Sequence, residues 1–251
     1  MLTEKQRLAF NYNGFLVIKN VANTEWLEKF HQVTEKLLSE ALPPIEYEAD
    51  LQYPGAPNSK GGIGGRTIRR IRQAFGRDPL FNQWINHPTL KSVVQSIVGS
   101  PSWLVKAHHN CVMTKFPEHS SDSLWHQDLR YWSYSKGELV TSWLALCHEH
   151  AENGCLQVIP GSHKLNFDAS RFDEKAFFKA KHSENMAMFR QAKVVELDPG
   201  DLLIFHCRLI HAAMRNFTTQ PKFAVVMTFR GEQDQPIEGS RSDLGGEVEM
   251  V

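Results

Sequence analysis

A histidine and an aspartate separated by one residue constrain the fold of this chain more than any other feature. They are His126 and Asp128, in the stretch Leu124–Leu129. Residues i and i+2 of a β-strand point to the same face, so both side chains can aim at one point. An imidazole and a carboxylate are two of the three ligands in the 2-His-1-carboxylate site, which holds non-haem Fe(II) and leaves coordination positions open. A chain with such a site needs a fold that brings the third ligand from elsewhere in the sequence.

The best candidate for the third ligand is His211. It follows an apolar, strand-like run that begins at Gly200, and a barrel strand at this place would return its side chains to the same pocket. A His-x-Asp spacing alone is common and more often marks a surface hydrogen bond, so the surrounding sequence has to support the metal hypothesis. His108 and His109 are also candidates, but we expect one to face outward and the other to be a hydrogen-bonding residue of the pocket wall.

Short strand-like runs dominate the second half of the chain. They cover about 103–116, 139–148, 155–159, 192–197, 201–206 and 223–230. Asn-Gly and Pro-Gly turns close several of them, which is typical of antiparallel all-β folds. We therefore predict an all-β core with flanking helices, arranged as a jelly roll, or double-stranded β-helix. A long excursion over 161–191 interrupts the strands and is expected to contain a short helix at about Phe172–Lys181.

Helical patterns are confined mainly to the first hundred residues. Thr3 and Gln6 have the spacing of a capping box for a short helix that ends near Asn13–Gly14. A longer helix is predicted from an apolar stripe at helical spacing, formed by Trp26, Phe30, Val33 and Leu37. Such a stripe is typical of a helix that packs on a sheet.

The length of 251 residues fits one domain. We expect a single domain over 1–251, with a helical part at about 1–100 and a jelly-roll core at about 101–232. The segment 43–68 is rich in Pro and Gly and is expected to be irregular, with Gly61–Gly65 in a mobile lid or substrate loop. The tail from Gln233 is expected to be loosely ordered.

Composition limits the class of partner and the compartment. The 28 basic and 28 acidic residues cancel, which argues against binding to nucleic acid or to a membrane surface through bulk charge. No apolar stretch is long enough to span a bilayer, and the N-terminus is polar. The four cysteines form no Cys-x-x-Cys pair, which favours free thiols in a reducing, cytoplasmic compartment. The oligomeric state is left open.

Three sequence blocks in a fixed order carry a family resemblance. They are His126-Gln127-Asp128, the run Asn153–Lys164 (NGCLQVIPGSHK) and the run Gly200–His211 (GDLLIFHCRLIH). On these blocks the chain resembles the phytanoyl-CoA dioxygenase family of Fe(II)/2-oxoglutarate oxygenases. The resemblance is dense from about Val105 to Arg230 and thin before that.

This resemblance implies that His126, Asp128 and His211 bind Fe(II), with 2-oxoglutarate and O₂ as co-substrates. The implied reaction releases succinate and CO₂ and hydroxylates a small molecule, while the metal supplies the difficult chemistry. Relatives that halogenate have a small residue in place of the carboxylate, which makes room for chloride. Because Asp128 is present, we expect a hydroxylase.

The resemblance also implies a set of contacts to 2-oxoglutarate. The family usually has an Arg eleven residues after the distal histidine, and Lys222 stands at that position. An ammonium can still pair with the distal carboxylate, although it lacks the bidentate fork of Arg. Arg70 corresponds to a second co-substrate cation, so an Arg of 69–72 is the alternative clamp. Gln127, Trp143 and Cys111 correspond to the remaining contacts.

The substrate is less constrained by the sequence. The arginines of 69–72, with Lys106 and Arg130, indicate a small molecule that carries an anionic group. The alternative is a catalytically silent jelly-roll protein that binds a metal or a ligand. A cupin-type zinc or manganese enzyme has less support, since such sites usually contain more histidines in a His-x-His spacing.

Overall fold

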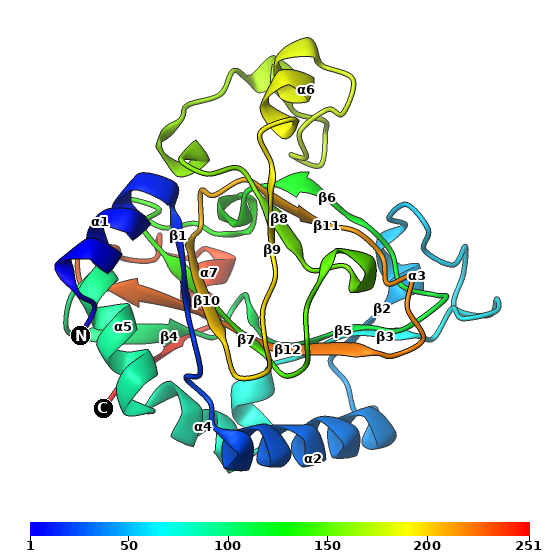
Figure 1. Cartoon of the computed structure of the whole chain (residues 1–251), viewed down its shortest axis with the longest axis horizontal. Helices are drawn as coiled ribbons and strands as arrows, with labels where there is room; N and C mark the ends of the chain where they lie inside the picture. Colours follow the sequence, from blue (N-terminus) through cyan, green and yellow to red (C-terminus); the bar gives the residue numbers. More distant parts are fainter.

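Two antiparallel β-sheets face each other in the computed structural model, which describes residues 1–251. Figure 1 shows helices along the outer face of the larger sheet and the α6 segment at the opposite end of the molecule. The predicted all-β core with flanking helices is therefore confirmed. No helix of the chain combines the length and the apolar character needed to cross a membrane.

The larger sheet has nine strands, and seven of them lie in one continuous order. That order is β1 (Phe15–Ile18), β10 (Leu202–His206), β7 (Val140–Ala145), β12 (Lys222–Gly231), β5 (Asn110–Lys115), β3 (Ile68–Arg72) and β2 (Ile45–Tyr47). β4 (Ser102–Val105) pairs with the far end of β12 and with β13 (Glu247–Glu249). Strands from both ends of the chain thus complete this sheet.

The smaller sheet has four strands and carries the candidate metal ligands. Its order is β6 (Ser123–His126), β11 (His211–Ala213), β8 (Leu156–Val158) and β9 (Lys193–Val195). In the register of β11 with β6, His211 lies directly opposite His126. The pairing of these two strands therefore brings together residues that are far apart in the sequence.

Strand β12 shows why the molecule has two cores. Alternate side chains of a strand point to opposite faces. Val225, Met227 and Phe229 belong to a cluster of 26 buried residues on the helix side of the sheet. Ala224 and Val226 belong to a second cluster of 13 buried residues between the two sheets. One strand thus supplies a packing face and a face that borders the candidate site.

Helices cover the packing face. The helices of the chain are α1 (Glu4–Asn13), α2 (Thr24–Glu40), α3 (Glu48–Leu51), α4 (Pro79–Ile85), α5 (Pro88–Val98), α6 (Ser183–Phe189) and α7 (Arg241–Leu244). The capping box of Thr3 and Gln6 is present, and α1 ends at Gly14 in the left-handed conformation with φ of 81°. Both features of the first helix are confirmed.

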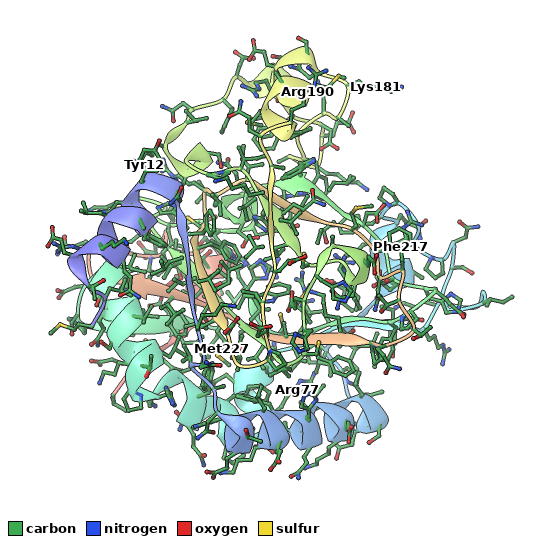
Figure 2. The ribbon with its side chains drawn as sticks, in the orientation of Figure 1. Tyr12, Arg77, Lys181, Arg190, Phe217 and Met227 are labelled. Carbon is green, nitrogen blue, oxygen red and sulfur yellow. The ribbon has the colours of Figure 1, made fainter.

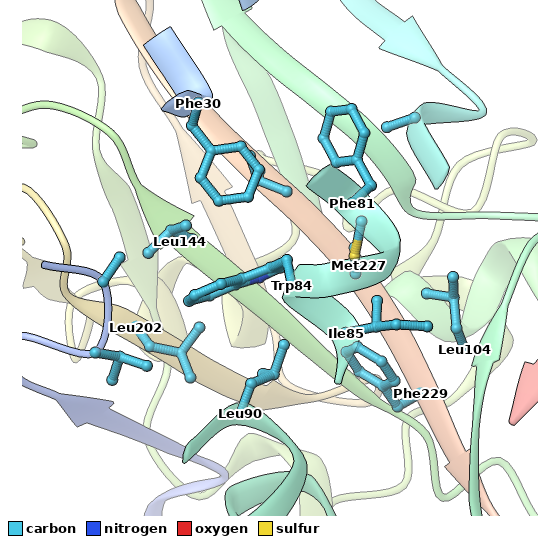
Figure 3. Close-up of a cluster of buried hydrophobic side chains, with 14 of the residues drawn as sticks. Phe30, Phe81, Trp84, Ile85, Leu90, Leu104, Leu144, Leu202, Met227 and Phe229 are labelled. Carbon is cyan, nitrogen blue, oxygen red and sulfur yellow. The ribbon is translucent and has the colours of Figure 1, made fainter. Parts of the chain in front are cut away.

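The aromatic residues of α2 and α4 form the centre of the larger cluster (Figure 3). The rings of Phe30 and Trp84 lie 5.7 Å apart in an edge-on arrangement, and the ring of Phe81 lies 5.8 Å from Phe30. Phe30 and Leu37 of the predicted stripe are buried, while Trp26 and Val33 pack against the cluster from its edge. The expectation of a helix packed on the sheet is confirmed.

Three local predictions about segments between residues 43 and 191 are wrong. The segment 43–68 is not wholly irregular, since it contains β2 and α3. The run 103–116 is two strands, β4 and β5, because residues 106–109 form a turn. The helix of the excursion is α6 rather than Phe172–Lys181, where Phe172 and Phe178 instead form an isolated β-bridge. The excursion holds the exposed residues Lys181 and Arg190 at one end of the molecule (Figure 2).

The tail from Gln233 is ordered by specific contacts. Asp234, which is 2% exposed, accepts backbone hydrogen bonds from Lys136 and Glu138. Glu247 of β13 pairs with Arg230, and Met250 is buried in the larger cluster. Tertiary contacts therefore override the loop-like composition of this segment.

Candidate metal centre

Three buried side chains converge at one end of the space between the sheets. His126 ends β6, Asp128 opens the short 3₁₀ turn Asp128–Tyr131, and His211 begins β11. One nitrogen of each histidine and one oxygen of Asp128 all lie within 4.8 Å of one another. The structure thus brings together the three residues that the sequence proposed as ligands.

The hydrogen bonds of the two histidines leave their metal-binding nitrogens free. His126 Nδ1 lies 2.7 Å from the carbonyl oxygen of Leu124, and His211 Nδ1 lies 3.0 Å from that of Leu209. A carbonyl oxygen only accepts, so each Nδ1 carries the hydrogen and each Nε2 offers a lone pair. Both Nε2 atoms lie 3.6 Å from Asp128 Oδ1, which suits one shared ion with bonds of about 2.0–2.2 Å. Two neutral imidazoles and a carboxylate therefore fit Fe(II).

The ionisation states also fit a metal site. Burial, followed by the neighbouring His126, lowers the pKa of His211 to about 4, so this imidazole is neutral at pH 7. Burial alone would raise the pKa of Asp128, but His109, His211 and His126 outweigh it and hold that pKa well below its ordinary value. The site therefore presents two lone pairs and one negative charge before any ion binds.

A third histidine, His109, contacts the same oxygen of Asp128 as the other two histidines. Its Nε2 lies 2.9 Å from Asp128 Oδ1, and only 9% of the residue is exposed. Since an ionised carboxylate only accepts, His109 Nε2 donates. The expectation that one of His108 and His109 is a hydrogen-bonding residue of the pocket wall is confirmed for His109. His108 is half-buried and bonds Ser242 Oγ at 3.0 Å, so the expectation that it faces outward is wrong.

A small cavity of about 50 Å³ adjoins the three ligands. Besides them, the predicted residues Arg70 and Trp143 line it, together with the apolar side chains Met113, Leu156, Phe205 and Val226. The guanidinium of Arg69 and the amine of Lys115 also line it. The cavity thus combines a metal-binding end, apolar walls and cations that can pair with a carboxylate.

Lys222 is buried, but it does not line this cavity. Only 3% of the residue is exposed, and its Nζ donates to Glu149 Oε2 at 2.7 Å. Trp143 Nε1 donates to the other oxygen of Glu149 at 2.7 Å, and Lys222 Nζ lies 5.0 Å from the Trp143 ring centre. Lys222 is therefore separated from the cavity by Trp143 and already has an internal anionic partner.

Two further predicted contacts also lie outside the cavity wall. Gln127 Nε2 donates to the carbonyl oxygen of Arg208 at 2.5 Å. Cys111 of β5 is 1% exposed and lies opposite Val226 of the neighbouring strand β12. The side chain of Val226 does line the cavity. Of the five residues proposed for 2-oxoglutarate, Arg70 and Trp143 therefore reach the cavity, while Lys222, Gln127 and Cys111 lie behind it or beside it.

Sequence reasoning missed Glu149 and Lys115. Glu149 was missed because its role depends on the distant Lys222, which it bonds together with Trp143 six residues before it. Lys115 shares a strand face with Cys111 and Met113, so the alternation of β5 could have revealed it. Burial, followed by the nearby Arg69 and Lys222, lowers the pKa of Lys115 well below its ordinary value.

Comparisons with known proteins agree with this geometry. Residues 10–224 match the family model "Phytanoyl-CoA dioxygenase (PhyH)". A probable phytanoyl-CoA dioxygenase of Caenorhabditis elegans is 28% identical over 226 residues, which cover 87% of this chain and 72% of the relative. The peroxisomal phytanoyl-CoA dioxygenase of Homo sapiens is 28% identical over 225 residues, covering 87% of this chain and 65% of the relative.

Solved structures support the fold. EctD from S. alaskensis, crystallised with 2-oxoglutarate and 5-hydroxyectoine, superposes with a TM-score of 0.77 at 19% identity. The match covers 94% of this chain and 78% of EctD. The jelly-roll prediction is confirmed by this likeness.

The fold and the family match define a non-haem Fe(II)- and 2-oxoglutarate-dependent dioxygenase of the hydroxylase type. The chain belongs to the phytanoyl-CoA dioxygenase family, as the sequence blocks predict.

Proposed function

We propose that His126, Asp128 and His211 bind a single Fe(II), and that this centre hydroxylates a small molecule that carries an anionic group. The observation that carries the proposal is the orientation of the two imidazoles. Both Nδ1 atoms are bonded to backbone carbonyls, so both Nε2 atoms converge on Asp128 Oδ1 at 3.6 Å. A surface His–Asp contact would lack this fixed and buried arrangement.

The bound iron and 2-oxoglutarate supply O₂ activation, with release of succinate and CO₂. The residues of the chain supply orientation and a fixed electrostatic environment. The backbone carbonyls of Leu124 and Leu209 fix the two rings, and His109 fixes the carboxylate of Asp128. Phe205, Val226 and Leu156 form an apolar wall that excludes water from the cavity.

The co-substrate clamp involves two candidate cations. Arg70 lines the cavity directly. Lys222 lies behind Trp143 and donates a hydrogen bond to Glu149. We propose that Arg70 contacts the distal carboxylate of 2-oxoglutarate. Lys222 reaches it only when Trp143 shifts, and Trp143, Gln127 and Cys111 shape the surrounding wall. A lysine with one bonded proton keeps two further donors for a second carboxylate.

We also propose that residues 1–251 work as one unit, since β1 and β3 from the first hundred residues lie in the same sheet as β7, β10 and β12. A cytoplasmic location is supported by the four free cysteines, three of which are buried. A balanced charge of 28 basic and 28 acidic residues supports a small-molecule substrate rather than nucleic acid or a membrane.

The deciding experiment supplies Fe(II), 2-oxoglutarate and O₂ and measures succinate, first without and then with a panel of small anionic molecules. Succinate release that disappears after metal removal and returns with Fe(II) supports the proposal. Mass spectrometry in chloride buffer should show a gain of one oxygen atom, because Asp128 occupies the position that chloride would need. A metal-independent signal would contradict the proposal. Metal binding without any succinate would favour the silent binding protein.

A further inference from the structure

A second, larger chamber opens directly outside the metal cavity. Its volume is about 380 Å³, against about 50 Å³ for the cavity. The two share four lining residues, Tyr53, Arg70, His109 and Tyr131. Any substrate that reaches the metal from this side therefore has most of its volume in the outer chamber.

The outer chamber continues into a surface groove. The groove has a volume of about 730 Å³ and shares Arg72, His108 and Arg241 with the chamber. Lys106 adds a further cation to the groove, and no carboxylate lines it. Cations therefore line the path from the metal cavity to solvent along its whole length.

The acidic residues of the outer chamber are already paired with other groups. Glu46 lies 3.6 Å from Arg70 Nε, and Asp50 lies 2.8 Å from Lys60 Nζ. The remaining cations of the chamber have no carboxylate oxygen within 4.0 Å of a side-chain nitrogen; these are Arg72, Arg130, Lys175 and Arg241. The chamber therefore holds four cations that have no ion-pair partner in the chain.

The guanidinium groups also have unused hydrogen-bond donors. Arg130 stacks on the ring of Phe177 at 3.6 Å and faces Tyr131 at 4.8 Å, which fixes its plane. Its NH1 nitrogen is buried and has no hydrogen-bond partner. Arg241 donates only to the carbonyl oxygen of Ala107, at 3.4 Å. An arginine that is fixed in place with free donors is suited to an oxyanion with several acceptor oxygens.

We propose that the outer chamber binds a phosphate group of the primary substrate, with Arg72, Arg130 and Arg241 as its donors. This inference rests on the proposed function, because it places the carbon to be hydroxylated in the inner cavity and the phosphate outside it. A phosphate monoester carries close to two negative charges at pH 7 and three acceptor oxygens. A single carboxylate would leave most of the four cations without an anion.

The half-buried His108 lies among these cations and is affected by them. Burial, followed by Arg241 and His109, lowers the pKa of His108 to about 3, and Arg72 acts in the same direction. Asp128 acts in the opposite direction but is outweighed. The imidazole of His108 is thus neutral at pH 7 and adds no charge of its own.

The test measures binding, so that it does not depend on turnover. Protein loaded with Fe(II) and 2-oxoglutarate under nitrogen is titrated calorimetrically with glycerol 3-phosphate, glycerate and glycerol. Glycerol 3-phosphate should bind at least about tenfold more tightly than glycerate, and glycerol should not bind. The affinity should fall as salt is raised, since exposed charges are screened within about 10 Å at 0.1 M.

Substitutions locate the site. Arg72→Gln and Arg130→Gln should each weaken glycerol 3-phosphate binding about tenfold or more. Arg190→Gln is the matched control, because Arg190 is exposed in the α6 excursion and lines neither the chamber nor the groove. Arg72→Lys keeps the charge and should recover part of the affinity, which guards against an effect of misfolding. Unchanged affinity in both glutamine variants overturns the proposal, as does tighter binding of glycerate.

A second ligand distinguishes two sources of phosphate. Adenosine 3′,5′-bisphosphate, a fragment of coenzyme A, should bind through the groove if the phosphate belongs to a nucleotide handle, and Lys106→Gln should then weaken it. Binding of glycerol 3-phosphate alone identifies a simple phosphate ester. If no phosphate binds while uncoupled succinate release persists, this inference fails and the oxygenase proposal stands. If phosphate binds but metal and 2-oxoglutarate produce no succinate, the oxygenase proposal fails and the phosphate site stands.

Discussion

The two faces of strand β12 are both buried, but one carries apolar side chains and the other carries paired polar side chains. On the helix side, Met227 and Phe229 are fully buried among apolar side chains such as Trp84 (Figure 3). On the inner side, Lys222 and Thr228 are equally buried, but each polar atom has a partner: Glu149 for Lys222 and Thr141 for Thr228. The first face stabilises the fold by removing apolar area from water, whereas the second tolerates burial only because its polar groups are paired.

This difference predicts two kinds of mutational effect. Substitutions on the helix side should change the free energy of unfolding and leave ligand affinity intact. Substitutions on the inner side should change ligand affinity, and they should cost stability only where they leave a buried charge without its partner. The predictions below test this division in order of expected size.

The largest effect is expected at the metal ligand. Asp128→Ala removes the carboxylate of the site, so activity should fall about 10⁴-fold or more. Stability should fall only by about 1–3 kcal/mol, the cost of leaving His109 without its acceptor. Succinate release, iron content and urea unfolding measure the three quantities. Asp198→Ala is the control, because Asp198 is exposed and its partner is Lys19 on the surface. Retained iron-dependent turnover in Asp128→Ala would refute the assignment.

The next effect concerns the packing face. Trp84→Ala should reduce the free energy of unfolding by about 3–5 kcal/mol, because it leaves a cavity between α2, α4 and the sheet. The buried indole Nε1 has no hydrogen-bond partner, so Trp84→Phe should cost much less. Iron affinity, measured at a temperature at which both variants remain folded, should not change. A tenfold loss of iron affinity in Trp84→Ala would show that the two faces are coupled.

The pair Lys222–Glu149 lies on the inner face and should affect both properties. Lys222→Ala leaves Glu149 buried and unpaired, which should cost about 3–5 kcal/mol. If Lys222 contacts 2-oxoglutarate, its loss should also weaken co-substrate binding by about ten- to a hundredfold. Calorimetry with Fe(II)-loaded protein measures that affinity directly, and Lys222→Arg should restore part of it.

A double variant separates the two roles of the pair. Lys222→Met combined with Glu149→Gln removes both charges, so most of the lost stability should return. Co-substrate affinity should stay low if Lys222 is a clamp. When Lys222→Ala leaves 2-oxoglutarate affinity unchanged but Arg70→Ala lowers it, the clamp belongs to Arg70.

The smallest ligand effect is expected at His109. His109→Phe keeps the volume and removes the hydrogen bond to Asp128 at 2.9 Å. Removal of such a supporting contact typically costs about 10–100-fold in metal affinity, and we expect the lower end because Asp128 keeps its other neighbours. A competition titration against a chelator measures the change. An unchanged iron affinity would show that packing alone orients Asp128.

Particular residues show how far the sequence alone could lead. His126 and Asp128 were identifiable because an i, i+2 spacing at the exit of a strand lets both side chains aim at one point, and His211 because an apolar run precedes it. In the structure, β6 ends at His126 and Asp128 opens the 3₁₀ turn that follows. The short helix α1 and the apolar stripe of α2 were also readable, since caps and helical spacing are local signals. In contrast, the order of the tail depends on Asp234 and Glu247. The hydrogen-bond partner of Asp234 lies 98 residues away in the sequence, and that of Glu247 lies 17 residues away.

The sequence by itself thus indicated the candidate ligands and determined the family and the succession of strands, because each is encoded in residues close together or in a fixed period. Only the tertiary structure decided that Glu149 neutralises Lys222, that His109 supports Asp128, and that unpaired arginines gather outside the metal cavity. These facts depend on distances between side chains from different strands and helices. The physical reason is that the burial and charge pairing of a side chain depend on the residues that the folded chain places around it. A local sequence pattern does not specify those residues.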